Sequence, residues 1–263
     1  MKFCRYGHVG AEKPGIVDAD GRIRDRSGVI DDITVDTIRD LSVDVANLPV
    51  VEGTPRYGVP VKGIGKIVAI GLNYADHAAE SNLPVPSEPM MFMKPLSSLT
   101  GPNDEVMLPK GSTHTDWEVE LAIVIGTTAR YVSKEDALDH VAGFTIANDV
   151  SARDEMFRDG QWARAKGYDT FCPTGPWIET ELDHRALEIQ TFVDGEPRRH
   201  GNTRDMVYSV EEIIAFASDV WTLLPGDLIL MGTPAGLGGF VDGQTIDITV
   251  EGIGTLSNPA VNR

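Results

Sequence analysis

Short apolar runs, each bounded by Gly, Pro, Asn or Asp, make up most of the chain beyond residue 60. Apolar runs of about four to eight residues between turn-forming residues are typical of β-strands. The runs do not alternate regularly with helical patterns, which argues against a doubly wound parallel sheet. The pattern therefore predicts an α+β, mainly β fold. Strands are expected at 66–72, 89–94, 119–126, 144–148, 187–193, 228–231 and 246–250.

Helical patterns are fewer than strand patterns. The clearest begins at Ser209, where Glu212 completes a capping-box pattern ahead of an apolar run. Other helices are expected over residues 34–41, from Ser133 onward, and within the segment 71–80. Hairpin turns, which join paired strands, are expected at Asp194-Gly195 and Asp242-Gly243.

Three prolines separate the beginning of the chain from the strand-rich remainder. Pro49, Pro55 and Pro60 lie in a polar stretch. Proline restricts the backbone and removes an N–H donor, so a cluster of prolines is typical of a connection. We therefore expect a small N-terminal α+β domain at 1–60 and a catalytic domain at 61–263.

The composition narrows the class of protein. Forty acidic residues against twenty-three basic ones give a net charge of −17, which disfavours a nucleic-acid binder because phosphates require basic surfaces. No apolar stretch approaches the roughly 18 residues of a membrane span, and the first residues lack a secretory signal. Cys4 and Cys172 form no CxxC pair, as expected for a reducing compartment. These features predict a soluble, cytoplasmic protein.

Two glutamates share one face of a strand that is otherwise apolar. Side chains alternate along a strand, so Glu118 and Glu120 lie on the same face as Ala122 and Val124. Two carboxylates beside a core repel each other and lose hydration unless a cation neutralises them. On this segment alone, a solvated strand end with two surface glutamates explains the pattern equally well.

Asp149 adds a third carboxylate at the end of the run 144–148. Three carboxylates without a nearby His or Cys cluster favour one hard divalent cation, Mg²⁺ or Mn²⁺, over zinc. In octahedral coordination the carboxylates leave the other half of the positions for water and a chelating substrate. One negative charge remains, which Lys166 is a candidate to offset; a surface lysine in a glycine-containing loop is the alternative.

Two further motifs carry candidate catalytic or binding groups. His77 and Glu80 share a face of the expected helix, and a carboxylate that orients an imidazole forms a general base for activating water. An exposed helix with one His and one Glu is the alternative. The glycine-rich loop 231–239 would let backbone N–H groups and the Thr233 hydroxyl approach an anion, although a turn between strands explains it as well.

Taken together and in order, these motifs resemble the fumarylacetoacetate hydrolase family. The resemblance extends from about residue 64 to the C-terminus. The matching segments are 71–80 (GLNYADHAAE), 92–95 (FMKP), 118–121 (EVEL), 148–154 (NDVSARD), 166–171 (KGYDTF) and 232–236 (GTPAG).

The resemblance implies a mixed β-sandwich roll catalytic domain, a small variable N-terminal domain and a homodimer. By motif position, it implies that Glu118, Glu120 and Asp149 are the metal ligands. It assigns catalysis to His77 and Glu80, on a segment that in relatives closes over the site as a lid. The remaining implied roles are charge stabilisation by Lys166, a contact of Thr233 with the substrate carboxylate, and contacts with the substrate or the ligands by Arg153, Lys94 and Gln161.

The implied reaction is hydrolysis of a 2-oxo acid of the acylpyruvate (2,4-dioxo acid) type. A water deprotonated by the dyad would attack the distal carbonyl, and cleavage of the C3–C4 bond would release pyruvate enolate. The opening segment resembles members that act on 2,4-diketo-3-deoxy acids derived from L-rhamnonate or L-fuconate. Oxaloacetate decarboxylation, an enolate-forming isomerisation, and non-catalytic binding of a metal or ligand are the alternatives.

Overall fold

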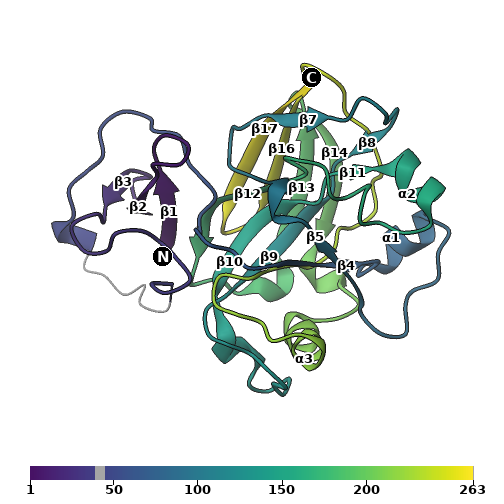
Figure 1. Cartoon of the computed structure of the whole chain (residues 1–263), viewed down its shortest axis with the longest axis horizontal. Helices are drawn as coiled ribbons and strands as arrows, with labels where there is room; N and C mark the ends of the chain where they lie inside the picture. Colours follow the sequence, from purple (N-terminus) through teal and green to yellow (C-terminus); the bar gives the residue numbers. More distant parts are fainter. Residues whose placement is uncertain (39–44, 263) are drawn as a thin grey trace.

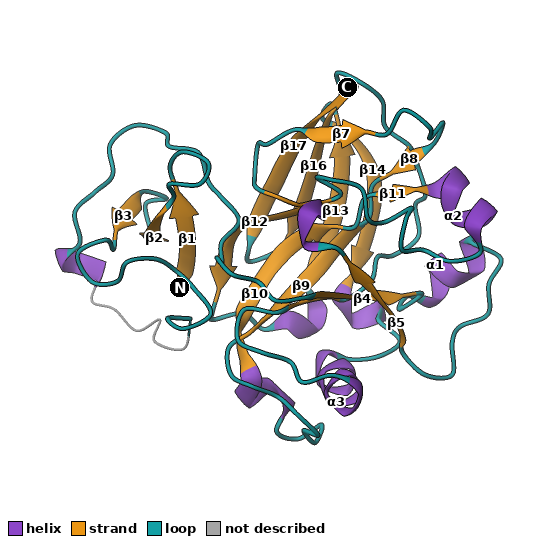
Figure 2. Cartoon of the chain, in the orientation of Figure 1, coloured by secondary structure: helices purple, strands orange, loops and turns teal. Residues whose placement is uncertain are grey.

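Two main β-sheets form the body of the protein in the computed structural model, which describes residues 1–38 and 45–262 (Figures 1 and 2). The larger sheet has ten strands within these residues, and most of its neighbouring strands are antiparallel. In spatial order it contains β3 (Ile23–Asp25), β2 (Lys13–Val17), β1 (Lys2–Tyr6), β12 (Cys172–Glu179), β10 (Val141–Asn148), β9 (Val119–Ile125), β15 (Leu228–Leu230), β4 (Ile67–Gly71) and β5 (Met90–Lys94), with β6 (Leu99–Thr100) paired to β12.

The smaller sheet and the helices complete the fold. The five-stranded sheet contains, in spatial order, β14 (Glu196–Asn202), β13 (Glu188–Val193), β16 (Thr245–Val250), β17 (Gly254–Asn262) and β7 (Val106–Leu108), and a two-stranded sheet pairs β11 (Ser151–Ala152) with β8 (Thr115–Asp116). The α-helices are α1 (Ala75–Glu80), α2 (Arg153–Asp159) and α3 (Val210–Val220). The 3₁₀ helices are Val45–Asn47, Leu96–Ser98, Ala137–His140, His184–Ala186 and Thr203–Asp205. Within the described ranges, no helix is long and apolar enough to cross a bilayer.

The apolar core lies on both faces of the larger sheet. The central strand β9 is buried along its whole length, which explains why apolar residues occupy both of its faces. Leu121 and Ile123 point into the core shared with β13 and β16 of the smaller sheet. Ala122 and Val124 point into a second core that includes Phe3 from the N-terminal strand β1. The face of β9 that carries Glu120 is therefore buried, like the opposite face, which packs against the smaller sheet.

The N-terminal strands extend the larger sheet at one end of the molecule (purple in Figure 1). Lys2 lies opposite Glu179 in the antiparallel pair of β1 with β12. Arg56 adds an ion pair with Asp104, which lies beyond the prolines. The domain boundary near residue 60 stays a prediction.

The strand predictions are confirmed, because the seven predicted runs coincide with β4, β5, β9, β10, β13, β15 and β16 to within a few residues. Asp194-Gly195 joins β13 to β14 as expected, whereas Asp242-Gly243 forms a turn that leads into β16 without joining two paired strands. The helix expected from Ser133 is only a 3₁₀ helix, because β10 begins directly after it. Of the helix expected at 34–41, residues 34–38 form a bridge and a turn, and 39–41 lie outside the described residues.

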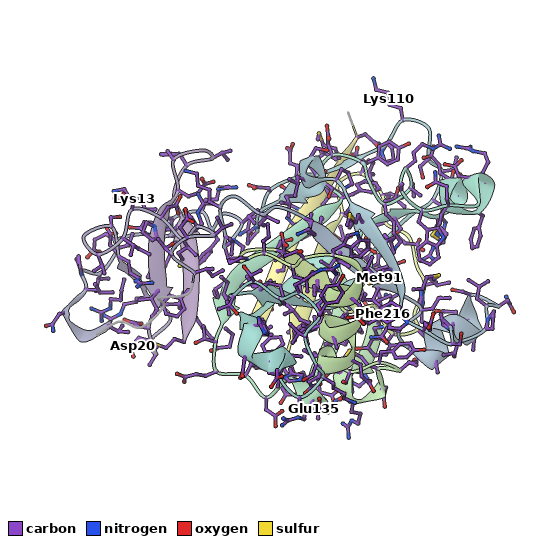
Figure 3. All side chains as sticks on the ribbon, turned by 60° about the horizontal axis from the view of Figure 1, so that its bottom comes forward. Lys13, Asp20, Met91, Lys110, Glu135 and Phe216 are labelled. Carbon is purple, nitrogen blue, oxygen red and sulfur yellow. The ribbon has the colours of Figure 1, made fainter. Side chains whose placement is uncertain are left out.

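Some charged side chains lie at the outside of the molecule, whereas both cysteines are buried as free thiols. Lys13 and Asp20 lie at the edge of the N-terminal part in Figure 3, and Lys110 and Glu135 lie at the edges of the body; all four are exposed.

The capping box of α3 provides a test of the fold. The Ser209 hydroxyl accepts a bond from the Glu212 N–H at 3.3 Å, and the Glu212 carboxylate accepts one from the Ser209 N–H at 2.9 Å. Ser209→Ala removes the first bond and should lower the free energy of unfolding by about 1 kcal/mol in urea titrations. Ser87→Ala, an exposed serine outside any helix, is the matched control. Equal stability of the two variants would contradict a stabilising cap.

Candidate active site

Glu118, Glu120 and Asp149 meet where β9 begins and β10 ends. The antiparallel register places Asn148 opposite Val119, so Asp149, one residue later, lies beside Glu118. The Asp149 N–H donates to the Glu118 carbonyl at 2.9 Å, and the Glu118 N–H donates to the Asn148 side chain at 2.9 Å. All three acids are buried, and one carboxylate oxygen from each lies within 4.8 Å of the others. These acids form what we call the triad.

Buried cations contact two members of the triad. Lys166 Nζ lies 2.7 Å from Glu118 Oε2 and 2.6 Å from Asp149 Oδ2. Arg153 donates to the other Glu118 oxygen at 2.7 Å, and Lys94 donates to the other Asp149 oxygen at 2.5 Å. Burial raises the pKa of Glu118, but Lys166 and Arg153 outweigh burial and hold this pKa well below its usual range. Glu118 is therefore a carboxylate at neutral pH.

Glu120 has a different environment. Its Oε2 accepts a hydrogen bond of 2.5 Å from the Gly232 N–H. Gly232 has a φ of +88°, and a Cβ there would lie 2.8 Å from the Asn73 Cβ, so the close approach requires glycine. Burial raises the pKa of Glu120 strongly, and the charges of Asp149 and Glu118 raise it further. Burial and these two acidic neighbours thus disfavour the charged form of Glu120.

The triad suits a hard divalent cation by its donor atoms and by its charge. Its ligands are all carboxylate oxygens, which Mg²⁺ and Mn²⁺ prefer. When ionised, four carboxylates face three cations and leave one negative charge. These groups are Asp116, which pairs with Arg153, together with Glu118, Glu120 and Asp149, against Lys94, Lys166 and Arg153. A divalent cation would reverse that charge and favour an anionic ligand.

His77 and Glu80 both lie on α1, but they do not form a hydrogen bond. His77 Nδ1 is 3.8 Å from Glu80 Oε2, beyond hydrogen-bond distance, and this nitrogen has no partner among the described residues. Burial lowers the pKa of His77 and outweighs the opposing charge of Glu118, so the imidazole is neutral near pH 7. The imidazole can therefore accept a proton, while the expected dyad contact stays a prediction.

Glu80 binds the glycine-rich loop. Its two carboxylate oxygens accept hydrogen bonds from the backbone N–H groups of Gly236 at 2.9 Å and Leu237 at 3.0 Å. Burial raises the pKa of Glu80, but these amide bonds outweigh burial and lower the pKa overall. The loop expected to bind an anion thus binds a carboxylate of the chain itself.

Arg199 fixes the other side of this loop. It is buried on β14, and its Nε and Nη2 donate to the Gly236 carbonyl at 3.0 and 2.8 Å. Its Nη1 donates to the Thr233 hydroxyl. Arg199 therefore holds the peptide whose N–H binds Glu80.

Both ends of the segment that carries α1 are tied to Tyr208. At the first end, the Asn73 side chain accepts from the Tyr208 N–H at 2.8 Å and donates to the Met231 carbonyl at 2.8 Å. At the other end, the Tyr208 hydroxyl donates to the Pro86 carbonyl at 2.7 Å. We call residues 73–86 the lid, since they cover the triad between these two anchors.

The cavity above the triad has little internal space. It has a volume of about 20 Å³, enough for about one water molecule. The lid contributes His77, Ser81 and Leu83 to its wall, and α2 contributes Arg153 and Met156; α1 and α2 lie at the same end of the molecule (Figure 2). A six-carbon substrate can enter only if part of this wall moves.

Only some of the remaining predicted residues line the cavity. Thr233 and Arg153 line the cavity. Lys94 lies behind the triad, where its ammonium donates to Asp149 and to the Val150 and Lys166 carbonyls, so it has no N–H left for a substrate. Gln161 is exposed, accepts from the Ala163 N–H and lines a neighbouring surface groove rather than the cavity.

Several residues of the site are not predicted from the sequence. Arg199 lies in a polar strand with no recognisable spacing relative to the triad. Asp116 directly precedes the predicted acidic strand and could have been found there. Trp162 stacks edge-on against Phe92, and both rings lie within 6 Å of Lys166 Nζ, the distance of cation–π contacts.

Comparisons with known proteins agree with this architecture. Residues 66–261 match the family described as fumarylacetoacetate (FAA) hydrolase C-terminal. A 2,4-didehydro-3-deoxy-L-rhamnonate hydrolase from Sphingomonas sp. (strain SKA58) is 59% identical over 90% of this chain and 85% of its own length. The solved fumarylacetoacetate hydrolase from psychrophilic Exiguobacterium antarcticum is similar with a TM-score of 0.91 at 36% identity, over 100% of both chains. For maleylpyruvate hydrolase from Sphingobium sp. SYK-6 the TM-score is 0.85 at 33% identity, again over 100% of both chains.

The fold and the buried triad thus define a mainly β enzyme of the type predicted from the sequence. The chain belongs to the fumarylacetoacetate hydrolase family. It is a hydrolase of that family, which acts on carbon–carbon bonds.

The contact between Glu80 and the loop predicts how the lid is held. Glu80→Gln keeps the shape but weakens both charge-assisted bonds, so the lid should open more often. Amide hydrogen exchange of residues 75–86 should rise about fivefold, as expected for a loss of about 1 kcal/mol. Glu88→Gln, on an exposed glutamate outside the helix, is the control. Unchanged exchange in Glu80→Gln would show that other contacts hold the lid.

Proposed function

We propose that this enzyme hydrolyses 2,4-didehydro-3-deoxy-L-rhamnonate. The observation that carries the proposal is the 59% identity, over 90% of the chain, to the Sphingomonas hydrolase of that name. The site supports it, since a buried triad, a neutral His77 and buried cations surround one cavity. The L-fuconate-derived analogue is the second candidate within the same substrate class.

The chemistry of this substrate fits a site that binds an anion at one end. Its name describes a six-carbon acid with oxo groups at C2 and C4, a hydroxyl at C5 and a methyl at C6. Addition of water across the C3–C4 bond gives pyruvate and lactate, so no oxidant or reductant is required. The reaction needs a base for the water and a stabilised enolate.

We propose Mg²⁺ or Mn²⁺ as the cation held by Glu118, Glu120 and Asp149. Such an ion would polarise the 2-oxo acid and stabilise the developing enolate charge. The high pKa of Glu120 supports a cation here, because burial and its two acidic neighbours otherwise favour protonation.

Side chains of the protein carry out the remaining steps, which are proton transfer, charge stabilisation and binding of the substrate carboxylate. His77 takes a proton from the water whose oxygen attacks C4, and the electron pair of the broken C3–C4 bond moves toward the 2-oxo oxygen. Lys166, held between Glu118 and Asp149, offsets charge beside that oxygen. Thr233, fixed by Arg199, contacts the substrate carboxylate. A proton then returns to C3.

Isomerisation on the same scaffold is the second candidate function. A structure named 5-carboxymethyl-2-hydroxymuconate delta-isomerase from Mycobacterium smegmatis is similar with a TM-score of 0.83 at 38% identity. The higher identity to the hydrolase favours hydrolysis. Oxaloacetate decarboxylation also passes through an enolate but uses no attacking water. A homodimer and a cytoplasmic location stay predictions.

Glu120→Ala tests the cation site and the reaction together. The wild-type enzyme, loaded with Mg²⁺ or Mn²⁺, should release pyruvate from the rhamnonate-derived acid in preference to oxaloacetate. Glu120→Ala should lose Mn²⁺ binding by calorimetry and lower the rate more than about 100-fold, because even supporting partners of metal ligands are worth about 10–100-fold. Glu88→Ala is the control. Full turnover after chelation of all metal would contradict the proposed cation.

His77→Ala tests the base. Hydrolysis of the dioxo acid should fall about 100–10,000-fold, the usual contribution of a general base. Decarboxylation of oxaloacetate should fall less, because it requires no deprotonated water. Both rates are measured as pyruvate release with the same metal-loaded preparation. A small, equal effect on both reactions would remove His77 from the mechanism.

A further inference from the structure

One hydroxyl in the wall of the cavity lacks a hydrogen bond. Ser81 lies directly after α1, and its N–H donates to the His77 carbonyl at 3.0 Å. Its hydroxyl oxygen is buried and bonds to nothing in the part of the chain that the structure describes. A buried hydroxyl without a partner is unfavourable, so such a group is most easily explained by a partner that arrives from outside the protein.

The position of Ser81 relative to His77 limits what that partner can be. The two residues are four apart on the lid, so they share one face and are separated by about 6 Å along the helix axis. Both line the cavity that contains the triad. If His77 deprotonates the water that attacks C4, Ser81 lies near the substrate atoms beyond C4, which are C5 and C6.

Apolar side chains make up another part of the cavity wall. Leu72, Leu83, Phe92 and Trp162 line the same cavity, and all four also line the adjoining surface groove. The charged groups of the cavity belong to the triad side, with Lys166 and Arg153. The carboxylate end of a substrate therefore belongs at the triad, and a short apolar end belongs toward the groove that these four side chains also line.

We propose that Ser81 is a specificity-determining residue that binds the hydroxyl next to the distal carbonyl of the substrate. The inference rests on the proposed hydrolysis of a 2,4-dioxo acid and names the feature of that acid which the lid recognises. The C5 hydroxyl takes the Ser81 hydroxyl as its partner, and the terminal methyl contacts the apolar wall. Ser81 reaches this position only when the lid is closed, so recognition of the hydroxyl accompanies closure.

A matched pair of substrates tests the proposal. 5-Hydroxy-2,4-dioxohexanoate, the rhamnonate-derived acid, and 2,4-dioxohexanoate have the same carbon chain and differ only in the C5 hydroxyl. The wild-type enzyme should prefer the hydroxylated acid, and Ser81→Ala should lower its kcat/KM for that acid about tenfold, the value of one neutral hydrogen bond. For 2,4-dioxohexanoate the change should be less than about twofold. Ser87→Ala, on an exposed serine of the same connecting segment, should change neither value.

The outcomes separate this inference from the proposed function. An equal loss of kcat/KM on both substrates would assign Ser81 a structural role and overturn the inference while hydrolysis stands. No loss on either substrate, or a wild-type preference for the acid without the hydroxyl, would overturn the inference as well. Failure of the wild-type enzyme to hydrolyse either acid would overturn the proposed function and the inference with it. Activity on 2,4-dioxohexanoate also reports whether the variant is folded.

Discussion

Buried carboxylates paired with buried cations hold the active site together. Glu118 and Asp149 each place both oxygens against a lysine or arginine, in an interior where an unpaired charge would cost several kcal/mol. The partners come from β5, α2 and the loop before β12, so this network ties three parts of the chain to the ends of β9 and β10. Removal of any one partner leaves another charge uncompensated. We therefore expect the site to be rigid where the triad lies, and any opening to occur above the triad, in the lid.

Features that depend only on neighbouring residues along the chain could be predicted from the sequence. Strand alternation identified Glu118 and Glu120 on one face, and the end of the next apolar run identified Asp149. Contacts between distant parts of the chain were harder to predict from the sequence. Spacing on a helix shows that His77 and Glu80 are neighbours, but it does not show which group the Glu80 carboxylate binds. In the structure, the Glu80 carboxylate accepts hydrogen bonds from the backbone amides of the glycine-rich loop. Arg199 was missed since its importance depends on the strand that brings it beneath that loop.

The overall acidity of the chain and the individual charges of its site act over different distances. A net charge of −17 repels an anionic substrate at long range, but at physiological salt this repulsion is screened beyond about 8 Å. Within the cavity, Lys166 and Arg153 are close and poorly screened. The charges inside the cavity therefore matter more for binding than the net charge, and salt should affect the surface far more than the site.

The two anchors of the lid at Tyr208 have an energetic consequence. Because Asn73 and Pro86 are both held to this one residue, the lid is a loop whose ends already lie together. Most of the entropy lost when a loop closes is lost in bringing its ends together. Here the rest of the folded protein already holds the two ends near each other, so closing the lid does not incur that loss again. Holding the loop over the triad then costs less free energy than it would for a loop with free ends, and the two amide bonds to Glu80 contribute to it. We therefore expect the lid to open by breaking the two bonds to Glu80 while both of its ends stay anchored at Tyr208.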